Sequence, residues 1–120
     1  MSKNRSFLTR LGFALNGIAH SLRSERSMQV HVAALASIAV VMLILAPAPQ
    51  WWALVSLACG GVLGAELTNT AIEHLADHLH PDSHPSIRIV KDCAAAAVLV
   101  MSLAAVGVAI ALAIHVWQRR

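Results

Sequence analysis

Charged residues are confined to separate parts of this 120-residue chain, and the stretches between them carry none. Residues 27–65 and 93–118 contain no Asp, Glu, Lys or Arg, whereas 66–92 hold seven charges. A helix of a soluble protein needs only one apolar stripe, but 93–118 is apolar on all sides over 26 residues, enough to cross a bilayer. Only 12% of the residues are charged, against about 25% in soluble domains. We therefore expect a single integral membrane domain, 1–120.

The predicted fold is all-α, with an N-terminal amphipathic helix on the membrane surface and three transmembrane helices. The surface helix covers 6–24, where apolar residues recur at helical spacing. The transmembrane helices are expected at 30–46, 51–79 and 92–117, and the second of them continues beyond the membrane on the cytoplasmic side. Pro47 ends the first span, because proline cannot continue a helix.

Lysine and arginine residues predict the orientation of the chain, because they gather on the cytoplasmic side of membrane proteins. Seven of them lie in or beside the surface helix, or between the second and third spans: Lys3, Arg5, Arg10, Arg23, Arg26, Arg88 and Lys91. We therefore expect the N-terminus in the cytoplasm and the C-terminus outside. The basic residues flank apolar segments instead of forming a stripe, so anionic lipid headgroups are the expected partner and nucleic acid is not.

Glu66 follows an apolar stretch that is too short to cross the membrane. At 1.5 Å per residue, the stretch from Trp51 to Ala65 spans about 22 Å, whereas the hydrocarbon core is about 30 Å thick. If Trp51 anchors the helix at one interface, Glu66 lies inside the low-dielectric region. A carboxylate there is costly and indicates a functional site.

Acidic and amide side chains gather near Glu66 at the cytoplasmic boundary. Four of them recur at i, i+3, i+7 and i+11 and share one helix face: Glu66, Asn69, Glu73 and Asp77. Glu25 reaches the same boundary from the junction before the first span, as do Lys91 and Asp92 from the start of the third. Carboxylates together with substrate phosphates suit Mg²⁺, a lysine suits a polyphosphate, and a buried acid can act as a general base. The set predicts phosphoryl transfer from a nucleotide to an alcohol at the membrane surface.

Other functions are compatible with an acidic residue inside the membrane. A small oligomeric transporter could use an intramembrane glutamate to exchange protons for a cation. A non-catalytic assembly subunit could use Glu66 and Asn69 for hydrogen bonds between helices. Gly60 and Gly64 are typical of close helix packing and not of a phosphate-binding loop, because no Lys-Ser/Thr follows them.

The polar motif resembles a known family. Glu66-Leu-Thr-Asn69-Thr-Ala-Ile-Glu73, then Asp77, then Lys91-Asp92 before an alanine-rich helix, is similar to the prokaryotic diacylglycerol kinase and undecaprenol kinase family. The resemblance covers nearly the whole chain. It implies a homotrimer of three-helix protomers in the bacterial inner membrane, with active sites shared between neighbours, that phosphorylates a lipid alcohol with ATP and Mg²⁺.

The resemblance also implies roles for individual residues. Glu66 would be the catalytic base that takes the proton from the lipid hydroxyl, and Glu25 and Glu73 would hold the Mg²⁺ ions that bridge the ATP phosphates. Asn69 and Asp77 would support the site. The nucleotide would contact Glu25, Glu73, Asp82, His84, Lys91 and Asp92.

The lipid acceptor is expected to be undecaprenol or diacylglycerol. Arg26, Met28 and His31, in the stretch Glu-Arg-Ser-Met-Gln-Val-His, resemble the undecaprenol kinase branch, as does Asn-Thr-Ala-Ile-Glu-His at 69–74. The residues expected to contact the lipid are Met28, Gln29, His31 and Glu66.

Overall fold

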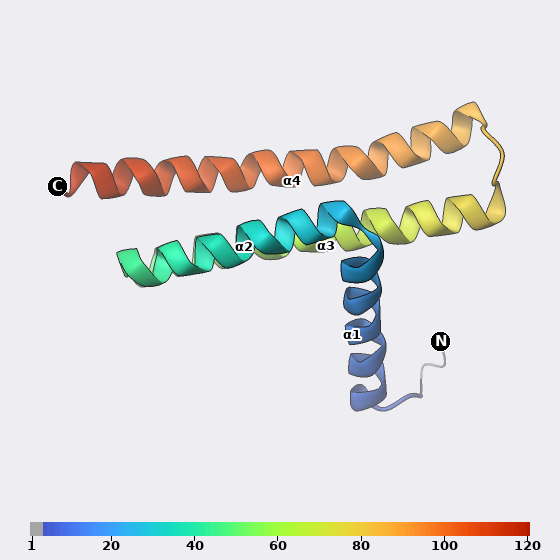
Figure 1. The fold of residues 1–120 in the computed structure, drawn as a ribbon, viewed down its shortest axis with the longest axis horizontal. Coiled ribbons are helices and arrows are strands. Elements are labelled where there is room, and N and C mark those ends of the chain that lie inside the picture. The colour runs from blue at the N-terminus through green and yellow to red at the C-terminus, as the bar shows by residue number, and fades with distance from the viewer. Residues whose placement is uncertain (1–3) are drawn as a thin grey trace.

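The computed structural model describes residues 4–120, which form four helices and no strand. The helices are α1 (Phe7–Ser24), α2 (Arg26–Leu45), α3 (Pro49–Leu79) and α4 (Pro85–Gln118). Figure 1 shows α2, α3 and α4 running alongside one another, while α1 leaves them at a steep angle. By length and composition α2, α3 and α4 can each cross a membrane, so the expected all-α membrane fold is confirmed. Lys3, which was counted for the orientation, lies outside the described residues.

The long helices continue beyond the apolar stretches that mark their membrane spans. α2 begins at Arg26, ahead of the expected span start at residue 30, and α3 begins at Pro49. α4 begins at Pro85, well before residue 92, because proline suits the first helical turn and His84 Nδ1 caps the helix by accepting from the Ser86 N–H at 3.1 Å. With 34 residues, α4 is about 51 Å long, longer than the roughly 30 Å hydrocarbon core. Hydropathy marks the part of a helix inside the membrane, and polar residues extend it outside.

Glu25 separates α1 from α2 as a single residue with extended backbone angles, φ −112° and ψ 115°. Its N–H donates to Ser21 O at 2.9 Å and so closes the last turn of α1. The Gln29 side chain donates to Leu22 O at 2.9 Å, which ties the start of α2 to the end of α1. These bonds hold the sharp turn between the two helices. The separate direction of α1 agrees with the expected surface helix.

α3 lies at the centre of the bundle and packs most extensively against α4. The two helices approach closely at Gly61, where an added Cβ atom would lie 2.1 Å from Met101 Cε. Within residues 4–120, an added Cβ at Gly60 or at Gly64 would meet no atom within 4 Å, so these two glycines are not a packing face inside one chain. Gly61 has that role.

Most of the large apolar side chains on α2 and α4 face outward. Leu43 and Ile44 on α2 are 71% and 77% exposed, and Leu99 on α4 is 59% exposed. Such surfaces are covered by lipid or by neighbouring chains when the protein is in a membrane. An apolar groove also runs between α2 and α4 along α3, lined by residues that include Ile38, Cys59 and Ala105.

Candidate active site around Glu66

Glu66 is the most deeply buried charged side chain of the described residues, with 2% of its surface exposed. α3 places it against the first two turns of α2. The Ser27 hydroxyl donates a hydrogen bond to Glu66 Oε1, and His31 Nε2 lies 3.6 Å from Glu66 Oε2. Ser27 and His31 are four residues apart, so both side chains lie on the α2 face that meets α3. A hydroxyl and an imidazole therefore satisfy the carboxylate in a segment that has no Lys or Arg.

The crossing of α1 over α3 marks the depth of Glu66. Ile18 and Ser21 of α1 line a pocket together with Leu67 and Thr70 of α3, and Leu67 is the next residue after Glu66 along α3. His20 at the end of α1 meets His74 of α3, with 3.3 Å between the two Nε2 atoms. If α1 lies on the membrane surface, Glu66 lies just beneath that surface. This is the level at which a lipid hydroxyl meets water-soluble reactants.

Asn69 lies one helical turn after Glu66 on α3. Its Oδ1 atom is buried and has no hydrogen-bond partner within residues 4–120. The side chain lines a pocket between α3 and α4, together with Ile72 and Val90. A buried amide oxygen without a partner costs free energy, so Asn69 Oδ1 is available for a group that the isolated chain does not supply.

Glu25 and Glu73 are half-buried, and neither carboxylate has a hydrogen-bond or ion-pair partner in the described part of the chain. Glu73 lies about 10 Å along α3 from Glu66, at 1.5 Å per residue. Within residues 4–120, no three or more His, Cys, Asp or Glu side chains are grouped closely enough to hold a metal ion. Mg²⁺ commonly takes only one or two carboxylates and completes its shell with phosphate and water. Two unpaired carboxylates fit that chemistry, and their role as Mg²⁺ ligands stays a prediction.

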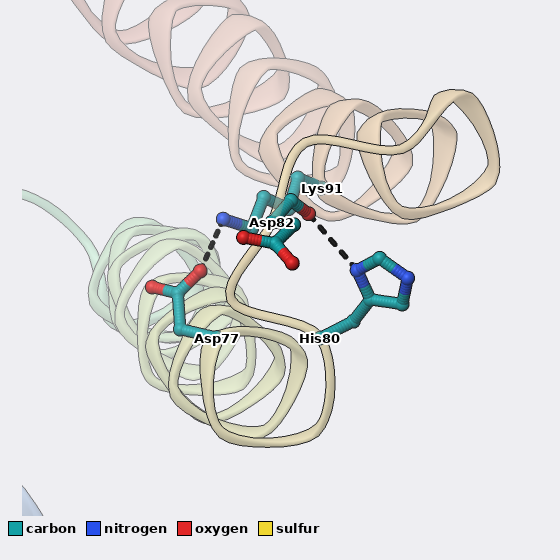
Figure 2. A network of polar contacts seen from close by, with 4 residues as sticks. All are labelled: Asp77, His80, Asp82 and Lys91. Atoms are coloured by element: carbon teal, nitrogen blue, oxygen red, sulfur yellow. Dashed lines mark hydrogen bonds and ion pairs between the residues drawn. The ribbon is translucent and has the colours of Figure 1, made fainter.

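A second polar cluster surrounds the turn between α3 and α4. Figure 2 shows Lys91 reaching from α4 to form an ion pair with Asp77 on α3, with Asp82 in the loop between them. His80 Nδ1 lies 2.9 Å from the backbone oxygen of Asp82, which shapes the loop. A pocket of about 210 Å³ lies here, and its polar lining includes His84.

Arg88 and Asp92 extend this cluster along α4. Arg88 Nε lies 3.1 Å from Asp92 Oδ1, and both side chains are largely exposed. Arg88 also lines the pocket at the turn, next to Lys91. The sequence did not single out Arg88 for a role at the site, although its position three residues before Lys91 places both cations on one face of α4.

The candidate residues thus fall into two groups in one chain. The structure brings Asp77, Asp82, His84 and Lys91 together at the α3–α4 turn, whereas Glu66, also on α3, lies against Ser27 and His31 of α2. Glu66 and Asp77 lie eleven residues apart on α3, about 16 Å along the helix axis. A reactant that contacts both groups must therefore be an extended molecule, or the second group must come from the α3–α4 turn of a neighbouring chain.

All three α2 residues expected to contact lipid have contacts within the chain, and that of His31 is with Glu66. Met28 is 1% exposed and packs inside the bundle, so it would touch a lipid only if it moved. Gln29 is exposed, and its side-chain nitrogen bonds to Leu22 O. Ser27, which the sequence did not single out, contacts Glu66 directly. The i, i+4 spacing of Ser27 and His31 in the first turns of an apolar helix was the signal that could have found it.

Comparison with known proteins matches residues 12–113 to the family model described as prokaryotic diacylglycerol kinase. This range contains every candidate site residue, from Glu25 to Asp92. The chain is also 36% identical to undecaprenol kinase of Bacillus subtilis (strain 168) over 87 residues, which cover 72% of this chain and 71% of that protein. No solved structure matches the chain significantly.

Proposed function

This chain belongs to the prokaryotic diacylglycerol kinase family and is a lipid kinase, and we propose that it transfers the γ-phosphoryl group of MgATP to the hydroxyl of undecaprenol or diacylglycerol. The products would be undecaprenyl phosphate or phosphatidic acid. The observation that carries the proposal is the Glu66 carboxylate, 2% exposed and held by Ser27 and His31 on the level of the surface helix. The relative named undecaprenol kinase favours undecaprenol as the acceptor.

In this proposal Glu66 accepts the proton of the acceptor hydroxyl as the oxygen attacks the γ-phosphorus. The base must meet the lipid hydroxyl near the headgroups, and the position of Glu66 beside the crossing of α1 supports this. Gln29 and His31 face the lipid from the start of α2. Asn69, whose buried Oδ1 has no partner within residues 4–120, orients the hydroxyl or a phosphate through its side-chain amide.

The nucleotide is held by helix-borne side chains and one short loop. Glu25 and Glu73 are the proposed Mg²⁺ ligands, and a divalent cation held by them would offset the negative charge of the ATP phosphates. Lys91 and Asp92 contact the nucleotide from α4, while Asp82 and His84 contact it from the α3–α4 loop. The pocket of about 210 Å³ at this turn, lined by Lys91 and Arg88, supports a polyphosphate site there.

The active enzyme is proposed to be a homotrimer in the bacterial inner membrane, with the N-terminus in the cytoplasm. The separation of about 16 Å between Glu66 and Asp77 along α3 supports active sites shared between protomers. The outward-facing apolar side chains of α2 and α4, such as Ile44 and Leu99, supply surface for packing between copies. The basic residues flanking α1 and α2 support the orientation.

A transfer assay tests the proposal. The purified full-length protein in mixed micelles is given γ-labelled ATP and Mg²⁺ with either undecaprenol or diacylglycerol as the acceptor. We expect label in a lipid phosphate with at least one acceptor, and loss of transfer when EDTA is added. A protein that is folded and oligomeric but transfers label to neither lipid would contradict the proposed function.

A further inference from the structure

The burial of Glu66 creates a problem of proton release. Phosphorylation of an alcohol by ATP forms an O–P bond, breaks the acceptor O–H bond and leaves one proton that must reach water. If Glu66 takes that proton, the protonated carboxyl group is buried, because only 2% of the Glu66 surface is exposed to solvent. A base that cannot lose its proton turns over once, so a second group must accept the proton from Glu66.

The two oxygens of the carboxylate have different neighbours. Oε1 accepts the hydrogen bond of the Ser27 hydroxyl, which holds it in place. Oε2 faces His31 Nε2 at 3.6 Å, and His31 is the one titratable side chain of residues 4–120 with a polar atom this close to the carboxylate. The distance is slightly longer than a hydrogen bond, so a small movement of the imidazole or one bridging water completes the contact.

His31 also has the exposure that Glu66 lacks. Its side chain is 26% exposed, against 3% for Glu66. An imidazole can accept a proton on one nitrogen while releasing a proton from the other. Of the two side chains within residues 4–120 whose polar atoms lie close to the carboxylate, Ser27 and His31, only His31 can carry a proton away.

We propose that His31 is the proton exit for Glu66 and that Ser27 orients the carboxylate toward it. The inference rests on the proposed kinase function. The proton of the acceptor hydroxyl passes to Glu66 Oε2 as the acceptor oxygen bonds to phosphorus and ADP leaves. It then passes to His31 Nε2, and the imidazolium releases its Nδ1 proton to water. Exchange with water then returns the imidazole to its Nδ1–H tautomer, which frees Nε2 for the next proton. Glu66 is again a carboxylate, and one proton has left for each lipid phosphorylated.

The test compares His31 variants in the full-length protein in mixed micelles. His31→Gln keeps a nitrogen near the position of Nε2 and can hydrogen-bond to Glu66, but it cannot carry a proton. We expect kcat to fall at least tenfold, with KM for ATP and for lipid within twofold of the wild type. For His31→Ala we expect a similar loss that is restored severalfold by added imidazole, because a diffusible base replaces the missing side chain. The control is His78→Gln, an exposed histidine of α3 that has no contact with Glu66.

The outcomes separate this inference from the proposed function. Wild-type kcat in His31→Gln, or a His31→Ala variant whose lost activity does not respond to imidazole, would overturn the role of His31. In both cases the wild type still phosphorylates lipid, so the kinase function stands. Unchanged gel-filtration profiles and KM values show that the variants are folded, so a loss of kcat is assigned to proton transfer.

Discussion

Lys91 and Asp77 form an ion pair that joins the first turns of α4 to the last turns of α3. The pair sets the direction of the Lys91 ammonium group (Figure 2), and Lys91 also lines the polar pocket at the α3–α4 turn. Since Asp77 is 63% exposed, water screens the pair and its contribution to stability is small. The pair matters because it orients the ammonium group of Lys91, which we propose contacts the nucleotide.

Asp77→Asn is therefore expected to alter ATP binding more than stability. The amide is nearly the same size as the carboxylate but does not hold the ammonium group by charge. We expect KM for ATP to rise severalfold, while the free energy of unfolding changes by less than about 1 kcal/mol. Steady-state kinetics and thermal unfolding in detergent measure the two effects. An unchanged KM would mean that Lys91 does not depend on Asp77 for its position.

Glu66→Gln is expected to keep the fold and the oligomer but lose phosphoryl transfer. Glutamine keeps the shape and still accepts the Ser27 hydrogen bond, but it cannot take a proton. General base catalysis is worth about 10²–10⁴-fold, so we expect kcat to fall at least about 10²-fold. The measurement is the mixed-micelle assay with gel filtration as the control for folding. Substantial turnover by the pure variant would remove Glu66 from the role of base.

Glu25→Gln and Glu73→Gln are expected to weaken the dependence on magnesium. Each change removes one of the unpaired, half-buried carboxylates proposed to hold Mg²⁺ with the phosphates. Activity measured against Mg²⁺ concentration should require severalfold more metal for half-maximal rate in each variant. The exposed Asp92→Asn variant provides a comparison at a residue proposed to contact the nucleotide but not the metal. A titration that coincides with the wild type would exclude the changed residue as a ligand.

Ser27→Ala is expected to lower kcat without changing either KM. The variant leaves Glu66 Oε1 buried without its donor, and losing such a hydrogen bond to a charged group costs about 1.5–3 kcal/mol. We expect roughly a tenfold loss of kcat, and recovery in Ser27→Thr because threonine restores the hydroxyl. Ser37→Ala on the same helix is the matched control, since Ser37 bonds only to the backbone oxygen of Ala33 in the described chain. Failure of threonine to recover activity would show that the hydroxyl is not what matters.

Gly61→Val is expected to destabilise the packing of α3 against α4. A Cβ atom at Gly61 would lie 2.1 Å from Met101 Cε, and because the end of a methionine is flexible, alanine should be accommodated while the branched valine is not. We expect a loss of about 1–3 kcal/mol for valine, partly recovered by Met101→Ala. Gly107→Val on α4 is the control, because an added Cβ there meets nothing within 4 Å. Unfolding in detergent compares the variants.

The membrane fold could be predicted because it depends on the length and composition of segments. The uncharged stretch 27–65 and the Trp51 anchor predict that Glu66 lies inside the low-dielectric region, and that depth in the membrane stays a prediction. The ends of the helices were harder to predict from the sequence. α4 begins at Pro85 and includes polar residues that lie outside the apolar stretch used to predict the span.

The partners of the site residues could not be predicted in the same way. The spacing of Ser27 and His31 shows that the two side chains share a face of α2, but which face of α2 meets α3 depends on how the helices pack. Neither the contact of Ser27 with Glu66 nor the burial of Met28 follows from the spacing alone. The pairing of Asp77 with Lys91 depends on the shape of the α3–α4 turn. The predicted roles of Glu25 and Glu73 involve ligands and a neighbouring protomer.

α3 is one unbroken helix from Pro49 to Leu79, and this continuity has a consequence for how the enzyme responds to its surroundings. The separation of about 22 Å between Trp51 and Glu66 fixes how far the proposed base lies from the proposed tryptophan anchor. With the tryptophans at one interface, a thicker bilayer is expected to draw the carboxylate away from the headgroups of the other interface, and a thinner bilayer to push it out among them. The length of α3 thus sets the depth of Glu66 in the bilayer. We therefore expect turnover in vesicles to be highest at one acyl-chain length and lower with both shorter and longer chains.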